Sequence, residues 1–133
     1  MRRAPALLLL ATLGASGVAA QTTSPTTPLG ANLEQFNYPY PLHWFATQSQ
    51  GAPVRMAYLD VPPSGKANGR TVVLLHGKNF CAATWQDTIA ALATAGYRVI
   101  APDQIGFCKS SKPGGYQYSF QALGALTRGL LEQ

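Results

Sequence analysis

The chain has 133 residues, of which 47% are hydrophobic and only 11% are charged, a balance that argues against disorder and allows one modest folded domain. The formal net charge is +5, but the basic residues are scattered and no nucleic-acid-binding motif accompanies them, so we expect no nucleic-acid partner. No His or Cys pair has the spacing of metal ligands, and no metal or cofactor is implied.

Residues 1–20 have the pattern of a secretory signal peptide. Arg2 and Arg3 precede an apolar stretch over residues 6–13, and small residues end at Ala20, where a signal peptidase would cut. The apolar stretch is well short of the roughly 20 residues needed to cross a bilayer, which argues against the alternative of a membrane anchor. We therefore expect cleavage after Ala20, a secreted or periplasmic protein, and no stable membrane anchor afterwards.

The next segments predict a linker and then a hairpin. Residues 21–31 are rich in Thr, Ser, Pro and Gly without periodic apolar positions, and we expect a flexible linker over residues 21–41. The folded domain is expected over residues 42–133. It begins with strand candidates at 42–47 and 54–61, joined by a polar turn over 48–53, which predict an antiparallel hairpin at the edge of a sheet.

A strand–helix–strand unit is predicted after the Pro- and Gly-rich break at residues 62–69. The continuous apolar run at 72–75 predicts a strand buried on both faces. A helix is expected between an N-cap at Thr84 and a C-terminal glycine, Gly96, and it shares one apolar face among Trp85, Ile89 and Leu92. The apolar strand at 97–101 follows, so the two strands should be parallel and the fold class α/β.

A last helix is predicted from an N-cap at Ser119 to the end of the chain. Gly124 and Gly129 each weaken this helix by about 1 kcal/mol relative to Ala. Its apolar positions keep helical spacing and are Phe120, Leu123, Leu126, Leu130 and Leu131.

Two segments carry the chemistry. His76-Gly77-Lys78-Asn79 directly follows the first buried strand, where glycine lets the chain turn sharply and lets backbone N–H groups face a ligand, as an oxyanion hole requires. The segment from Asp103 to Pro113 follows the next parallel strand, so it lies at the same carboxyl edge of the sheet, where ligands of open α/β sheets bind.

Together the two segments resemble the amino-terminal part of the α/β-hydrolase superfamily, in the branch of esterases, epoxide hydrolases and haloalkane dehalogenases. The resemblance covers residues 42–133 and rests on His-Gly-x-x-Phe between a strand and a helix with Trp85, and on a strand ending in Pro-Asp. The second motif continues through Gly106, Ser110 or Ser111, Lys112 and Pro113.

The resemblance implies a role for the backbone of the first motif. The N–H of Lys78 would be one oxyanion donor, and the N–H of Asn79 is the neighbouring candidate. The other donor would follow a nucleophile in a Gly-x-Ser/Asp/Cys-x-Gly elbow, which does not occur in the chain, so no catalytic residue is assigned here. His76 and Gly77 are expected to shape the loop, because the catalytic histidine of this superfamily comes last in chain order.

The second motif is expected to shape and line the same edge. Asp103 should hold the loop 104–111 through backbone hydrogen bonds, and Gly106 should help to turn it. Three apolar loop residues either line a substrate pocket or seal the core, namely Phe80, Ile105 and Phe107.

The two cysteines raise the question of a disulfide. Cys81 and Cys108 each follow a predicted strand, and an exported chain permits a bridge, although the sequence favours two separate, partly buried thiols. Cys108 stands where the related family usually has a second glycine. If that position needs a positive φ, Cys108 is strained there, or it was recruited to pair with Cys81.

The expected function follows from these parts. We expect the amino-terminal part of a secreted or periplasmic hydrolase that attacks an ester-like bond of a small molecule by nucleophilic catalysis, inactive alone because nucleophile, acid and catalytic histidine are absent. The alternative is a non-catalytic binding protein, or an inert truncated product, of the same fold. Without the nucleophile strand of this superfamily, the strand at 72–75 would be an open edge, so self-association is expected.

Overall fold

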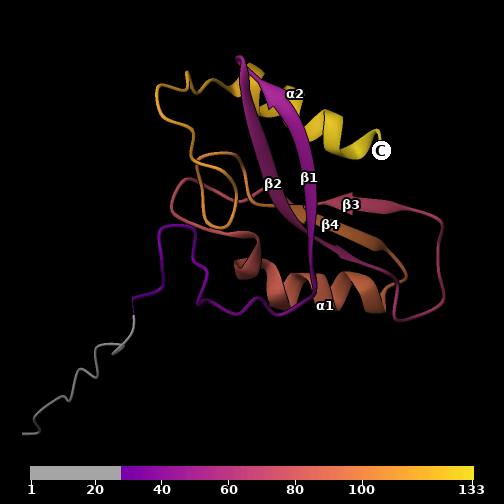
Figure 1. Ribbon diagram of the computed structural model, residues 1–133. Helices are drawn as coiled ribbons and strands as arrows, with labels where there is room; N and C mark the ends of the chain where they lie inside the picture. Colours follow the sequence, from indigo (N-terminus) through magenta and orange to yellow (C-terminus); the bar gives the residue numbers. More distant parts are fainter. Residues whose placement is uncertain (1–27) are drawn as a thin grey trace, which may run out of the picture.

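The structure is a computed structural model that describes residues 28–133, so the predicted signal peptide and the first part of the predicted linker lie outside the described residues. One mixed sheet has the strand order β1-β2-β4-β3. Its strands are β1 (Leu42–Ser49), β2 (Ala52–Val61), β3 (Thr71–Val73) and β4 (Arg98–Pro102). Helices α1 (Gln86–Thr94) and α2 (Phe120–Leu131) lie on opposite sides of this sheet (Figure 1). The predicted α/β class is confirmed.

The hairpin of β1 and β2 is confirmed, with a shorter turn than predicted. The antiparallel ladder runs from Leu42 opposite Leu59 to Ser49 opposite Ala52. Only Gln50 and Gly51 remain for the turn, and both have positive φ, 51° and 76°. A two-residue turn of this kind matches the right-handed twist of the strands, so the ladder continues through residues that the sequence assigned to the turn.

Strand β4 lies between two neighbours and is buried on both faces. It pairs antiparallel with β2 and parallel with β3, as the sequence predicts for the second pair. Val99 and Ala101 pack into the cluster on the α1 side, whereas Ile100 packs into the cluster on the α2 side. This alternation lets one strand contribute to two cores.

Strand β3 differs from its prediction in length and burial. It ends at Val73, although the N–H of Leu74 still donates to the carbonyl of Ile100 at 2.9 Å. Val72 and Val73 are half-buried and Leu75 is 53% exposed, so the expected burial on both faces is wrong. The reason is topological, because β3 is the last strand of the sheet that residues 28–133 form.

Helix α1 is preceded by a short 3-10 helix, η1 (Ala82–Trp85), and this changes its start. Thr84 lies within η1 and its hydroxyl donates to the carbonyl of Cys81 at 2.7 Å, so the predicted N-cap is wrong. The predicted end is confirmed, since Gly96 has a φ of 92° and donates its N–H to the carbonyl of Ala93. The apolar face of Trp85, Ile89 and Leu92 packs into one cluster as predicted.

Helix α2 starts where the sequence predicts. The Ser119 hydroxyl accepts the N–H of Ala122 at 3.1 Å, which is an N-cap bond. Leu126 and Leu130 are buried against the sheet, but Phe120 is 92% exposed. The helix therefore packs through its later turns. None of the helices within residues 28–133 is long and apolar enough to cross a membrane.

Candidate functional site

A tight turn follows β3 at the carboxyl edge of the sheet. The N–H of Phe80 donates to the carbonyl of Gly77 at 3.0 Å, which leaves Lys78 and Asn79 at the exposed tip. Within residues 28–133, neither the N–H of Lys78 nor that of Asn79 donates a hydrogen bond. Both predicted oxyanion donors are thus placed on the turn with their backbone donors open to a ligand, as stabilising a developing negative charge requires.

His76 ties this turn to the neighbouring loop. Its Nδ1–H donates to the carbonyl of Gly77 at 2.8 Å, and its Nε2 accepts the N–H of Gln104 at 2.9 Å. Since Nε2 must be an acceptor here, the partners assign a neutral ring with its proton on Nδ1. Both ring nitrogens are occupied by the backbone, which suits the loop-shaping role that the sequence predicts rather than that of a catalytic base.

Asp103 joins three segments of the chain at one buried carboxylate. Oδ2 accepts the N–H of Lys109 at 3.0 Å, the loop-holding contact that the sequence predicts. Oδ1 accepts the N–H of Ala82 at 2.8 Å, and Oδ2 also accepts the hydroxyl of Tyr38 at 2.5 Å. The last two contacts join residues 21 and 65 positions away, so no local signal in the sequence could have revealed them.

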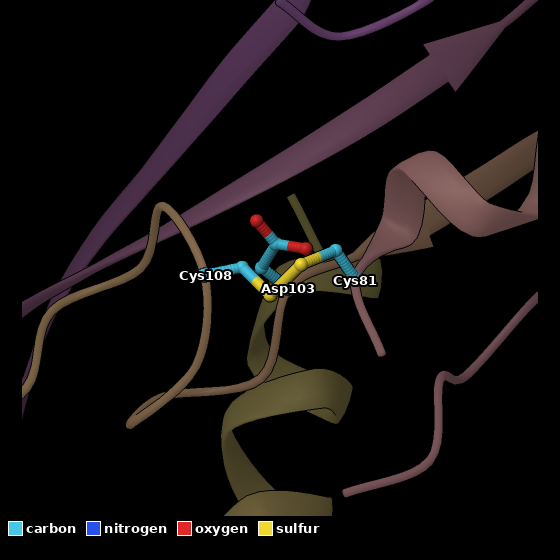
Figure 2. Close-up of side chains that lie close together, drawn as sticks. All are labelled: Cys81, Asp103 and Cys108. Carbon is cyan, nitrogen blue, oxygen red and sulfur yellow. A yellow bond between two sulfur atoms is a disulfide. The ribbon is translucent and has the colours of Figure 1, made fainter. Parts of the chain in front are cut away.

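A disulfide links the loops that follow β3 and β4. Cys81 and Cys108 are bonded, with their Cα atoms 5.8 Å apart, and Figure 2 shows the Asp103 carboxylate beside the bridge. The preference for two separate thiols is therefore wrong. Parallel pairing of β3 and β4 brings both loops to one edge, and the bond from Asp103 to Ala82 holds the residue next to Cys81 there.

Cys81, Asp103 and Cys108 lie close together but do not form a metal site while the disulfide is intact. Their ligand atoms lie within 4.8 Å of one another. A cysteine binds a metal as a thiolate, and both sulfurs are used by the disulfide. The three donors to Asp103 also occupy both of its oxygens.

The loop after β4 needs two residues with positive φ. Gly106 has a φ of 94°, and a Cβ there would meet the Tyr118 ring at 2.5 Å, so glycine is required. Its N–H donates to the carbonyl of Ser111 at 2.8 Å, which closes the loop. Cys108 has a φ of 48°, the left-handed conformation expected because it stands where the related family usually has a second glycine.

A hollow of about 450 Å³ lies beside the turn. It is lined by Leu75, His76, Gly77, Phe80, Thr84 and Trp85. Of the predicted pocket residues, only Phe80 lines it and is exposed. Ile105 is fully buried in the cluster on the α2 side, so it seals the core instead, and Phe107 packs edge-on against the His76 ring, 5.5 Å away. The sequence did not indicate that Leu75, Thr84 and Trp85 line this hollow, because the strand at 72–75 was expected to be buried on both faces.

The residues before β1 form an arm along the same edge, which corrects the predicted linker from residue 32 onward. Tyr38 and Tyr40 pack against the cluster on the α1 side. The Lys109 ammonium donates to the carbonyl of Leu33, and the Lys112 ammonium donates to Asn32 at 2.9 Å. Burial, and then the hydrogen bond to Asp103, raise the pKa of Tyr38 above its ordinary value, so its hydroxyl stays protonated and donates.

Known proteins resemble this chain over the same region. A family model of the alpha/beta hydrolase fold matches residues 70–132. A crystal structure of a probable hydrolytic enzyme from Pseudomonas aeruginosa PAO1 is 66% identical, with a TM-score of 0.74, over 76% of this chain and 32% of that one. A haloalkane dehalogenase from Mycolicibacterium paratuberculosis is 41% identical over 92 residues, 68% of this chain and 29% of the relative. Epoxide hydrolase A from Mycobacterium tuberculosis is 41% identical over 75 residues, 56% of this chain and 23% of the relative.

The family model covers the parallel pair of β3 and β4 with its helical crossover, and the chain belongs to the α/β-hydrolase superfamily. It spans less than a third of the length of these relatives. The described fold is therefore one part of a hydrolase domain.

Proposed function

We propose that the chain is the amino-terminal part of a hydrolase that cleaves an ester-like bond in a small molecule by nucleophilic catalysis. The observation that carries this proposal is the turn of residues 77–80, whose two free N–H groups lie between Gly77 and Phe80, two residues that line an apolar hollow. Attack on an ester carbonyl places negative charge on its oxygen, and fixed N–H donors stabilise that charge without reorganising.

The other catalytic groups are proposed to come from outside this chain. The printed sequence contains no Gly-x-Ser/Asp/Cys-x-Gly elbow, so a nucleophile, an acid and a histidine base would have to be supplied elsewhere. Ser110 is an unsuitable nucleophile, because it is buried, accepts the N–H of Ala57 and donates to the carbonyl of Asp103. We also propose export through the amino-terminal signal sequence.

Substitution of Lys78 tests the oxyanion role directly. Lys78→Pro deletes the backbone N–H at the second position of a four-residue turn, where proline is well tolerated. Lys78→Ala removes the same side chain and keeps the N–H. In the hydrolase that carries this sequence together with the missing catalytic groups, Lys78→Pro should lower kcat by about 10²- to 10³-fold, and Lys78→Ala should leave it nearly unchanged. Equal kcat values for the two variants would contradict an oxyanion role for the Lys78 N–H.

The 133-residue chain alone should not hydrolyse p-nitrophenyl acetate above background. Turnover that survives replacement of both Ser110 and Ser111 by Ala would contradict the assignment of the nucleophile to other sequence. The gene beyond codon 133 provides a further check. An elbow motif there would support the hydrolase, whereas a genuine stop codon would support the alternative of an inert or purely binding protein.

A further inference from the structure

The arm before β1 contacts the candidate site through a partly buried hydrogen bond to Asp103. The Tyr38 hydroxyl donates to Asp103 Oδ2 at 2.5 Å, and the Asp103 side chain is fully buried. The Tyr38 ring is held in turn by an edge-on contact with Phe36, 5.7 Å between ring centroids. A hydrogen bond to a buried charged group is among the stronger ones in a protein, so this contact fixes the carboxylate firmly.

Asp103 and its neighbour hold both ends of the oxyanion turn. The N–H of Gln104 donates to His76, at the start of the turn, and Asp103 Oδ1 accepts the N–H of Ala82, just after its end. The two carboxylate oxygens belong to one planar group. The bond from Tyr38 to Oδ2 therefore also sets the direction in which Oδ1 points toward Ala82.

We infer that Tyr38 is a positioning residue for the oxyanion turn. Its hydroxyl orients the Asp103 carboxylate, and the carboxylate anchors Ala82 so that the free amides of Lys78 and Asn79 keep one orientation. The arm thereby acts on the site although it contributes no atom to the turn itself. The importance of that orientation rests on the proposed function, whereas the contacts do not.

Tyr40 offers a matched control for this inference. It lies two residues along the same arm and packs on the same cluster, but its hydroxyl is 3.3 Å from the carbonyl of Gln86 and is not bonded to Asp103. Tyr38→Phe and Tyr40→Phe therefore remove the same single oxygen atom from the same arm. Only the first of these changes removes a donor to Asp103.

Hydrogen–deuterium exchange of the disulfide-intact chain measures the effect without any substrate. In peptides covering residues 77–83, Tyr38→Phe should speed exchange of the hydrogen-bonded amides of Phe80 and Ala82 by roughly tenfold, the expected consequence of losing one bond to a buried charge. The hairpin at 42–61 should exchange at the same rate in this variant. Tyr40→Phe should change neither region.

The Ala82 amide gives a second, spectroscopic readout. Its NMR chemical shift reports the bond to Asp103, and it should move in Tyr38→Phe but not in Tyr40→Phe. The positioning role would be overturned if Tyr38→Phe left exchange in residues 77–83 unchanged. It would also be overturned if the variant accelerated exchange equally in these residues and in the hairpin. Failure of the proposed function would appear instead in the Lys78→Pro assay, so the two failures are distinguishable.

Discussion

Cys108 adopts a backbone conformation that most L-amino acids avoid, with a φ of 48°. The left-handed region costs a residue with a Cβ roughly 1 kcal/mol, whereas glycine enters it freely. The bridge to Cys81 opposes this cost by tying the residue to the loop after β3. The same residue thus introduces backbone strain and supplies the covalent link that holds it.

Replacing Cys108 in a Cys81→Ala background separates these two effects. Without the bridge, Cys108→Gly should be more stable than Cys108→Ala by about 1 kcal/mol, because only glycine relieves the strain. Urea denaturation followed by circular dichroism, with both variants in the same buffer, provides the comparison. Equal stabilities, or a more stable alanine variant, would show that the native loop does not require this φ in solution.

At the scale of the elements, one ion pair crosses from β2 to β4. Arg98 donates to the two oxygens of Asp60 at 2.8 and 2.5 Å, in a fork that binds both strands beyond their ladder. The hydrogen bond from Arg98 lowers the pKa of Asp60 below its ordinary value of 3.8, against a smaller opposing effect of burial. The Arg98 side chain is 52% exposed, so solvent screening limits the stabilisation to about 1 kcal/mol or less.

This pair makes part of the stability depend on pH. Because the pKa of Asp60 is lower in the folded state, its contribution is complete above the ordinary value of 3.8 and is lost as pH falls below it through the folded pKa. Asp60→Asn should therefore reduce the unfolding free energy by up to about 1 kcal/mol at pH 7, and the difference from wild type should shrink below pH 4.

Denaturation at several pH values, with Glu132→Gln as control, checks this expectation. Glu132 pairs with Arg128 on the surface of α2, where both side chains are largely exposed, so its replacement should have a smaller effect. A difference between Asp60→Asn and wild type that stays constant from pH 7 to pH 2 would contradict the linkage.

At the scale of the whole molecule, the sheet has an apolar edge strand. β3 pairs with β4 on one side, and no strand within residues 28–133 pairs with its other side. The N–H of Leu74 points to β4, and successive N–H groups alternate along a strand, so the N–H of Val73 faces the open side. Unpaired backbone groups beside exposed apolar side chains favour pairing with another chain.

We expect the isolated chain to associate as its concentration rises. Val73→Pro removes the outward N–H without touching the bond to β4, and it should reduce association, whereas Val73→Ala loses similar packing and should not. Sedimentation velocity over a range of concentrations measures the outcome. A wild-type chain that stays monomeric and unfolds cooperatively would contradict association through the open side of β3.

The sequence by itself was enough to predict the superfamily, the hairpin, the parallel strand pair and the helix ends at Gly96 and Ser119. These depend on local chemistry, namely the period of apolar residues and the backbone preferences of glycine and serine. The candidate oxyanion turn was found in the same way, because a His-Gly dipeptide after an apolar run is a local signal.

Only the tertiary structure decided the disulfide, the burial of Ile105, the exposure of β3 and the packing of the arm. Each depends on residues that are distant in the chain, such as Tyr38 and Asp103, which the fold brings within 2.5 Å. Whether a side chain is covered depends on which elements are its neighbours in the sheet. That is why the sequence could indicate the candidate oxyanion turn, whereas the contacts that hold this turn form only when the fold brings β3 and β4 together.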